Sequence, residues 1–178
     1  MPSYVSDALP AFARTWRVVL KESALLEKTR QRLLNRPVDA EWVLRVEKDD
    51  DIAERMEAFV SRYGRLQDTL GDKLFPRLLE LIGQRGKTLL DVLNQVERIG
   101  LLHDAQSWLE WRNLRNQLVH EYMESPQEFA IALNTANEYA RHLVAVVAAI
   151  QEWLASLGLG RCDAGQRDAH IDRSGPPR

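Results

Sequence analysis

The side chains best suited to chemistry lie close together late in the chain, at helical spacing. Arg112, Asn116 and His120 follow one another at intervals of four residues, which places them in one stripe along a helix. Arg115 and Tyr122 are seven residues apart and form a neighbouring line. A histidine exchanges protons near neutral pH, and an arginine holds phosphate oxygens with its forked N–H groups. Together these residue types suit acid–base chemistry at a phosphate group.

The angle between the arginine and the histidine constrains how they could act together. At about 100° per residue, Arg115 and His120 lie about 140° apart around one helix. They could serve one phosphate if the arginine side chain bends round, if the helix distorts near its end, or if two copies of the helix face each other. The third arrangement predicts a symmetric homodimer built around this helix.

The same residues could also have a purely structural role. An arginine and a histidine at this spacing are common by chance, and Arg115 could pair with Glu110 or Glu121 on a solvated helix face. The apolar residues of the same helix share a different face, which is predicted to face the core: Trp111, Leu114 and Leu118, at i, i+3 and i+7. Trp108 is likewise expected in the core or in an interface rather than as a platform for bases.

A second polar group occurs earlier in the chain. Arg62, Arg65, Asp68 and Asp72 are predicted to lie on the helix side opposite the apolar face that contains Phe59. The simpler interpretation is an exposed, salt-bridged surface. The alternative is that part of this group flanks an active groove.

The elements that must position these residues are helices. Glycine and proline leave five long uninterrupted segments, within which apolar residues recur at helical spacing: 11–36, 38–63, 87–99, 101–125 and 127–157. No sustained alternation or hairpin turn supports strands. The sequence therefore predicts an all-α, up-and-down bundle of about five helices.

Local signals refine the helix boundaries. Pro76 cannot donate a backbone hydrogen bond, which predicts a kink or break between Gly71 and Pro76. Gly100 is expected to end its helix in a left-handed conformation. Ser125, followed by a proline and then by Glu128 three residues on, predicts a capping box at the start of the last helix.

Length and composition limit the classes of protein. The 178 residues suit one helical domain at 1–157, followed by a glycine-rich and proline-rich flexible tail at 158–178. The net charge of −2 argues against a coat of basic residues for duplex DNA and leaves room for a local basic site. No apolar window approaches a membrane span and the start lacks signal-peptide features, so the expected location is cytoplasmic, without membrane association.

Several kinds of site lack sequence support. Cys162 is the only cysteine, and no histidine pair has metal-ligand spacing, so no metal site is expected. There is no phosphate-binding loop, dinucleotide-binding glycine motif or nucleophile elbow. Nucleotide hydrolysis and acyl transfer are therefore not expected.

The string Arg115-Asn116-x-x-x-His120-x-Tyr122 resembles the R-x-x-x-x-H-x-Y signature of the HepT-like branch of HEPN domains. Residues 59–79 look like the long second helix of that branch, and the Gly-Leu-Leu at 100–102 also fits. The resemblance covers residues 50–125 by motif and the helical layout by pattern. It implies an all-helical domain that dimerises.

In that family the arginine and histidine meet across a dimer groove and cleave RNA without a metal. The resemblance thus implies catalytic roles for Arg115, His120 and Asn116, and no cofactor for this chain. His120 would be the acid or base, Arg115 would hold the phosphate, and the cleaved RNA would end in a 2′,3′-cyclic phosphate. Arg112, Arg65 and Asp68 are candidate flanks of the groove.

The resemblance also implies a partner. In the family the tyrosine accepts AMP from a cognate MNT-type nucleotidyltransferase antitoxin, which uses ATP and Mg²⁺, so Tyr122 is the expected modification site. The chain would then be the RNase toxin of a toxin–antitoxin pair. Two alternatives remain: a non-catalytic, substrate-binding partner subunit of a nucleotidyltransferase, and a purely structural helical dimer.

Overall fold

A computed structural model of the chain describes residues 4–46, 48–120 and 125–160, with the backbone alone at 119 and 120. All regular elements in these residues are helical: a short 3-10 turn η1 (Ser6–Ala8), α1 (Leu9–Leu33), α2 (Ala40–Val46), α3 (Asp50–Asp68), a π-helical segment η2 (Thr69–Leu74), α4 (Phe75–Leu81), α5 (Leu89–Arg98), α6 (Ala105–His120) and α7 (Pro126–Ser156). The prediction of an all-helical bundle is confirmed.

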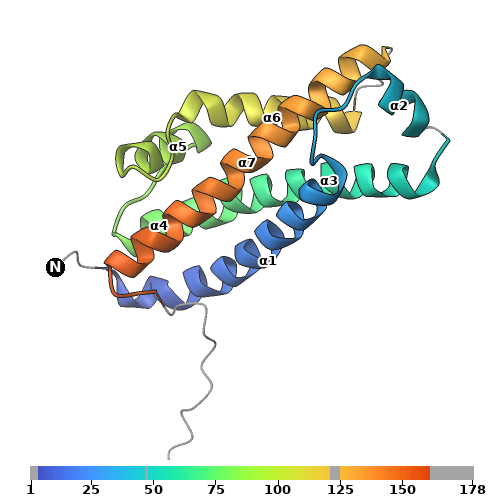
Figure 1. Cartoon of the computed structure of the whole chain (residues 1–178). Coiled ribbons are helices and arrows are strands. Elements are labelled where there is room, and N and C mark those ends of the chain that lie inside the picture. Colours follow the sequence, from blue (N-terminus) through green and yellow to red (C-terminus); the bar gives the residue numbers. More distant parts are fainter. Residues whose placement is uncertain (1–3, 47, 121–124, 161–178) are drawn as a thin grey trace, which may run out of the picture.

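The four longest helices run in alternating directions. Figure 1 shows α1, α3, α6 and α7 crossing the molecule in turn, with α2 at one end and α5 at the other. The most extensive packing is between α1 and α3, and α6 lies against both α3 and α7. The buried apolar side chains form one continuous core, whose largest fully buried members include Trp108, Tyr63, Phe12, Phe59 and Phe75.

The predicted segment 38–63 is two helices rather than one. The side chain of Asp39 accepts from the backbone N–H of Trp42 at 2.8 Å, at the start of α2. Asp49 caps α3 by accepting from the backbone N–H of Ile52 at 3.2 Å. Two aspartate caps thus divide a stretch that contains no glycine or internal proline.

The predicted irregularity between Gly71 and Pro76 is present as a π-helical segment. The N–H of Phe75 donates to the carbonyl of Leu70, five residues earlier, so the helix continues through a widened turn into α4. Pro76 occupies the first turn of α4, where a missing N–H costs nothing. The widened turn keeps α3, η2 and α4 as one long, kinked rod beneath α6.

The predicted ends of the later helices are partly correct. Gly100 has a φ of 79°, as expected for the residue that ends α5. Ser125 occupies the N-cap position of α7, but its side chain makes no capping hydrogen bond, so the predicted capping box is wrong. A complete capping box is found instead at the start of α5, between Thr88 and Asp91.

The end of α7 determines where the compact domain stops. Gly158, with a φ of 75°, lets the chain reverse, and the N–H of Leu159 donates to the carbonyl of Leu154 at 2.8 Å. Leu159 is buried against the core, so the packed chain continues beyond the predicted boundary at 157. The remainder of the predicted tail, 161–178, lies outside the described residues. None of the described helices is long and apolar enough to cross a membrane.

Candidate functional site

Two acidic side chains cap the N-terminus of α6 by accepting hydrogen bonds from its first backbone N–H groups. Asp104 accepts from the backbone N–H of Ser107 and from its hydroxyl, both at 2.7 Å. The Ser107 hydroxyl, followed by its N–H, lowers the pKa of Asp104 below the ordinary value. Glu97, from the end of α5, accepts from the N–H of Ala105 at 2.8 Å. These contacts fix the start of the helix that contains the predicted site.

Trp108 is buried as expected, but it lies at the centre of the buried face of α6, where the prediction placed Leu114 and Leu118. Trp108 is 1% exposed and packs against Phe75 with ring centroids 5.0 Å apart. Trp111 is buried as predicted, whereas Leu114 and Leu118 are only partly buried at the edge of the core. The reason is that α6 packs against both α3 and α7: Trp111 contacts aromatic rings of α7, and Trp108 meets Phe75 at the start of α4.

Two glycines on the rod allow this close approach. A Cβ placed on Gly71 would lie 3.2 Å from the indole of Trp108, and one placed on Gly64 would lie 2.7 Å from Nε of Arg115. The two glycines are seven residues apart and therefore share one face of the rod. Their seven-residue spacing inside a strong helical pattern is the sequence signal for this close approach.

Two polar side chains of α3, near these glycines in sequence, donate hydrogen bonds to α6. The hydroxyl of Tyr63 donates to the carbonyl of Trp111 at 2.9 Å, and the amide of Gln67 donates to the carbonyl of Trp108 at 3.4 Å. Burial raises the pKa of Tyr63 far above its ordinary value, so its hydroxyl stays protonated and donates. A buried hydrogen bond of this kind contributes about 1 kcal/mol to stability.

Arg115 lies within this helix–helix contact, not off it as predicted. Seven residues place Arg115 about 20° from Trp108 around α6, and its side chain is 25% exposed. One terminal nitrogen donates to Asp68 at 2.5 Å, and the other donates to Asn116 at 2.9 Å. Within the described residues Arg115 makes no ion pair with Glu110, and Glu121 lies outside them.

Nε of Arg115 is buried beside Gly64 and has no hydrogen-bond partner among the residues that the structure describes. Leaving a charged donor's N–H unpaired costs free energy, which the pairing of the two terminal nitrogens offsets. Arg115 is therefore both a packing residue and the most constrained cation of the predicted site.

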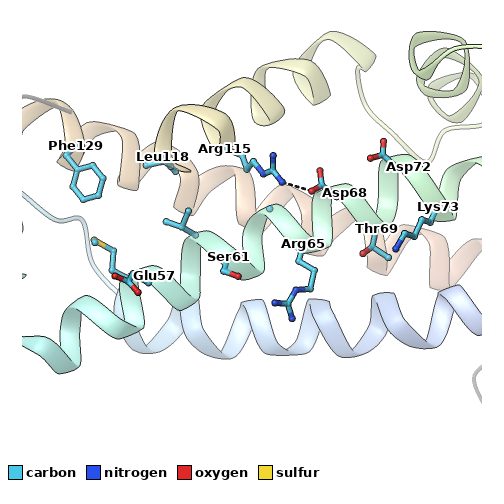
Figure 2. A pocket seen from close by; sticks show the side chains of 13 residues that line it. Glu57, Ser61, Arg65, Asp68, Thr69, Asp72, Lys73, Arg115, Leu118 and Phe129 are labelled. Carbon is cyan, nitrogen blue, oxygen red and sulfur yellow. Dashed lines mark hydrogen bonds and ion pairs between the residues drawn. The ribbon is translucent and has the colours of Figure 1, made fainter. Parts of the chain in front are cut away.

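A groove of about 650 Å³ opens along α3 beside Arg115. It is lined from three helices: by Met56, Glu57, Val60, Ser61, Gly64, Arg65, Asp68, Thr69, Asp72 and Lys73 of the rod, by Arg115 and Leu118 of α6, and by Phe129 of α7. Figure 2 shows Arg115 reaching across to Asp68, with Leu118 and Phe129 at the apolar end of the groove. Three cations and three carboxylates line it, so its net charge is close to zero.

The predicted flanking residues have different positions in this site. Asp68 lies in the groove and pairs with Arg115, whereas Arg112 pairs with Asp72 at 3.6 Å beside it. Arg65 lines the groove but points to the α1 side of α3, away from Arg115 (Figure 2). Arg62 does not belong to this groove and contacts α1 instead. Asp68 and Asp72 thus form ion pairs with α6, as the simpler interpretation predicted, and Arg65, Asp68 and Asp72 line the groove.

A partly buried carboxylate, Glu22 on α1, lies near Thr69, which lines this site. Burial raises the pKa of Glu22 on α1, against the lowering effects of the Thr69 hydroxyl and of the cations Arg65 and Lys73.

The remaining predicted residues lie at or beyond the end of α6. Asn116 is exposed and accepts from Arg115. His120 is the last residue of α6, one turn after Asn116, and its side chain lies outside what the structure describes. Tyr122 lies outside the described residues altogether. No cluster of three potential metal ligands occurs in the part of the chain that the structure describes.

Comparison of the chain with protein-family models, with curated proteins and with solved structures finds no match.

The close approach of Gly64 to Arg115 predicts that the two residues are coupled in their effect on stability. We expect Gly64→Ala to lower the free energy of unfolding by about 1–3 kcal/mol, because the new methyl group displaces Arg115 from Asp68. In an Arg115→Ala background the same change should raise stability by about 0.5–1 kcal/mol, since alanine is the better helix former. Urea denaturation of the four chains measures this coupling.

Gly71→Ala is the matched control, because its methyl group meets Trp108 rather than Arg115. Its cost should be the same in both backgrounds. Additive effects of Gly64→Ala and Arg115→Ala would show that the arginine does not occupy the position described.

Proposed function

We propose that this chain is a metal-independent endoribonuclease whose active groove is the one beside Arg115, and that it acts as a homodimer in the cytoplasm. The observation that carries the proposal is the placement of Arg115, a constrained and partly exposed guanidinium on the wall of a 650 Å³ groove. The motif resemblance supplies the reaction class, and the residues present suit that reaction.

Arg115 keeps donors available for a phosphate. Each terminal nitrogen of a guanidinium has two N–H groups, and one on each is used by Asp68 and Asn116. The remaining N–H groups can donate to a phosphate oxygen and stabilise the charge that develops during cleavage. Since the side chain is already ordered, little conformational entropy is lost on binding.

His120 is the proposed acid–base residue. One imidazole takes the proton of a ribose 2′-hydroxyl while that oxygen attacks the adjacent phosphorus. The bond from phosphorus to the 5′-oxygen breaks, and a protonated imidazole gives its proton to that leaving oxygen. The products are a 2′,3′-cyclic phosphate and a 5′-hydroxyl. Positions 115 and 120 lie about 140° apart on α6, and a second copy related by a two-fold axis would supply the second imidazole.

The proposal predicts RNA cleavage that depends on His120. We expect His120→Gln to reduce the rate of cleavage by about 10² to 10⁴, the usual contribution of general acid–base catalysis. His103→Gln, an exposed histidine before α6, is the matched control and should cleave like the parent chain. Gel analysis of RNA fragments, with and without a chelator, measures the cleavage. Light scattering of the same samples measures the oligomeric state.

Cleavage that survives in His120→Gln, cleavage that the chelator abolishes, or full activity from a monomer would refute this assignment. Arg115→Lys is more informative than Arg115→Ala here, because lysine keeps a charge for Asp68 and removes only the forked donor geometry.

One observation favours the alternative of a non-catalytic partner subunit. Asp68 neutralises Arg115 at 2.5 Å, and the groove as a whole has balanced charges, which weakens its attraction for a polyanion. In that case the chain binds a nucleotidyltransferase and cleaves no RNA. Cleavage by the purified parent chain decides between the two functions.

The proposed regulation is the transfer of AMP to Tyr122 by a cognate MNT-type nucleotidyltransferase with ATP and Mg²⁺. The tyrosine oxygen attacks the α-phosphorus of ATP, pyrophosphate leaves, and the phenol proton passes to solvent. Each AMP unit adds about one negative charge, which opposes RNA phosphates. We expect an AMP-sized increase in intact mass for the parent chain and none for Tyr122→Phe.

Tyr4→Phe is a control for this modification, since Tyr4 is exposed at the other end of the sequence. An AMP-sized increase that persists in Tyr122→Phe, or that is absent from the parent chain, would contradict the proposed regulation.

A further inference from the structure

A second concavity, of about 320 Å³, lies between α1 and α3 and has a different charge from the groove beside Arg115. Four of its lining residues are cations and one is a carboxylate: Leu25, Lys28, Thr29, Arg32, Glu54, Arg55, Ala58 and Arg62. In a chain of net charge −2, this basic pocket is a local concentration of positive charge.

The cations of the basic pocket have few acidic neighbours in the described part of the chain, where Glu54 is the one carboxylate among the lining residues. Among the residues that the structure describes, Lys28, Arg32, Arg55 and Arg62 make no ion pair. The nearby Glu27 on α1 pairs with Arg30 instead, at 2.7 Å. The positive charge therefore remains available to a ligand from solution.

The pocket is built on rigid elements. Arg62 donates to the hydroxyl of Thr29, which in turn donates to the carbonyl of Leu25 at 2.9 Å, so α1 and α3 are tied together at its base. Lys28 and Arg32 are one turn apart on α1. Opposite them on α3, Arg55 lies two turns before Arg62. Two facing rows of cations thus border the concavity.

The pocket is close to the groove beside Arg115. Arg65 is three residues after Arg62 on α3, so the two side chains are neighbours on the helix surface. Arg65 also lines the groove and points to the α1 side (Figure 2). A strand seated in the groove can therefore cross α3 at Arg65 and reach the pocket.

We propose that the basic pocket binds backbone phosphates of single-stranded RNA, outside the phosphate that is cleaved. The inference rests on the proposed function for the identity of the ligand. Three of the four cations are arginines, whose forked donors match phosphate oxygens, and the Thr29 hydroxyl adds a neutral polar group. Contacts of this kind strengthen binding equally for all base sequences and make it sensitive to salt.

The test measures RNA binding in a His120→Gln background, which prevents the proposed cleavage. The pocket variant is Lys28→Gln, Arg32→Gln and Arg55→Gln; all three positions are exposed, and Arg62 is left in place because it contacts Thr29. The control variant is Arg85→Gln, Lys87→Gln and Arg98→Gln, the same charge change at exposed positions in and before α5. Fluorescence anisotropy with a labelled, mixed-sequence single-stranded RNA gives Kd at several salt concentrations.

We expect the pocket variant to bind about tenfold more weakly and to lose about two units of the slope of log K against log salt, since three phosphate contacts are removed. The control should stay within about threefold of its parent, through its effect on net charge alone. Equal losses in the two variants, or no loss in the pocket variant, would overturn the inference.

Failure of this inference is distinguishable from failure of the proposed function. A parent chain that cleaves no RNA, but binds it through the pocket, refutes the cleavage and supports the pocket. A parent chain that cleaves RNA while its pocket variant binds normally refutes the pocket alone.

Discussion

The close contact between α6 and the α3–η2 rod is the constraint on which the rest of the site depends. Gly71 admits the indole of Trp108, and Gly64 admits the side chain of Arg115, so the two helices approach more closely than larger residues would allow. Tyr63 then locks the register by donating to a backbone carbonyl of α6. Because the register is locked, Arg115 has one position relative to the groove.

The same contact gives Arg115 two roles that oppose each other. Its pairing with Asp68 orders the guanidinium and contributes up to about 1 kcal/mol at this partly exposed position. The pairing also cancels much of the charge that a phosphate would meet. In the proposed enzyme, a phosphate binds the N–H groups of Arg115 that Asp68 leaves available, and the four cations between α1 and α3 supply attraction that the charge-balanced groove lacks.

The sequence predicted the helices better than the way they pack. Apolar spacing located the long helices, and Pro76 correctly indicated the irregular turn, because both effects are local. The predicted core face of α6 was centred on Leu114 and Leu118 instead of Trp108. The spacing of apolar residues shows that a helix has a buried face, but it does not show which neighbouring helix that face contacts. Asp68 was predicted as a possible flank, but its pairing with Arg115 joins residues far apart in sequence, and a single sequence contains no signal for that. The basic pocket was missed for the same reason, because its two rows belong to different helices.

The central claim is that Arg115 is the phosphate-binding residue of the groove and is restrained by Asp68. The most direct measurement is the affinity of the Asp68→Asn variant for single-stranded RNA, in the His120→Gln background, together with its free energy of unfolding. Asparagine keeps the size of the side chain and removes the competing charge, so the account predicts tighter RNA binding, by about threefold to tenfold, with equal or lower stability. An unchanged or weaker affinity, in a variant that is still folded, would contradict the claim and leave the Arg115–Asp68 pair with a structural role alone.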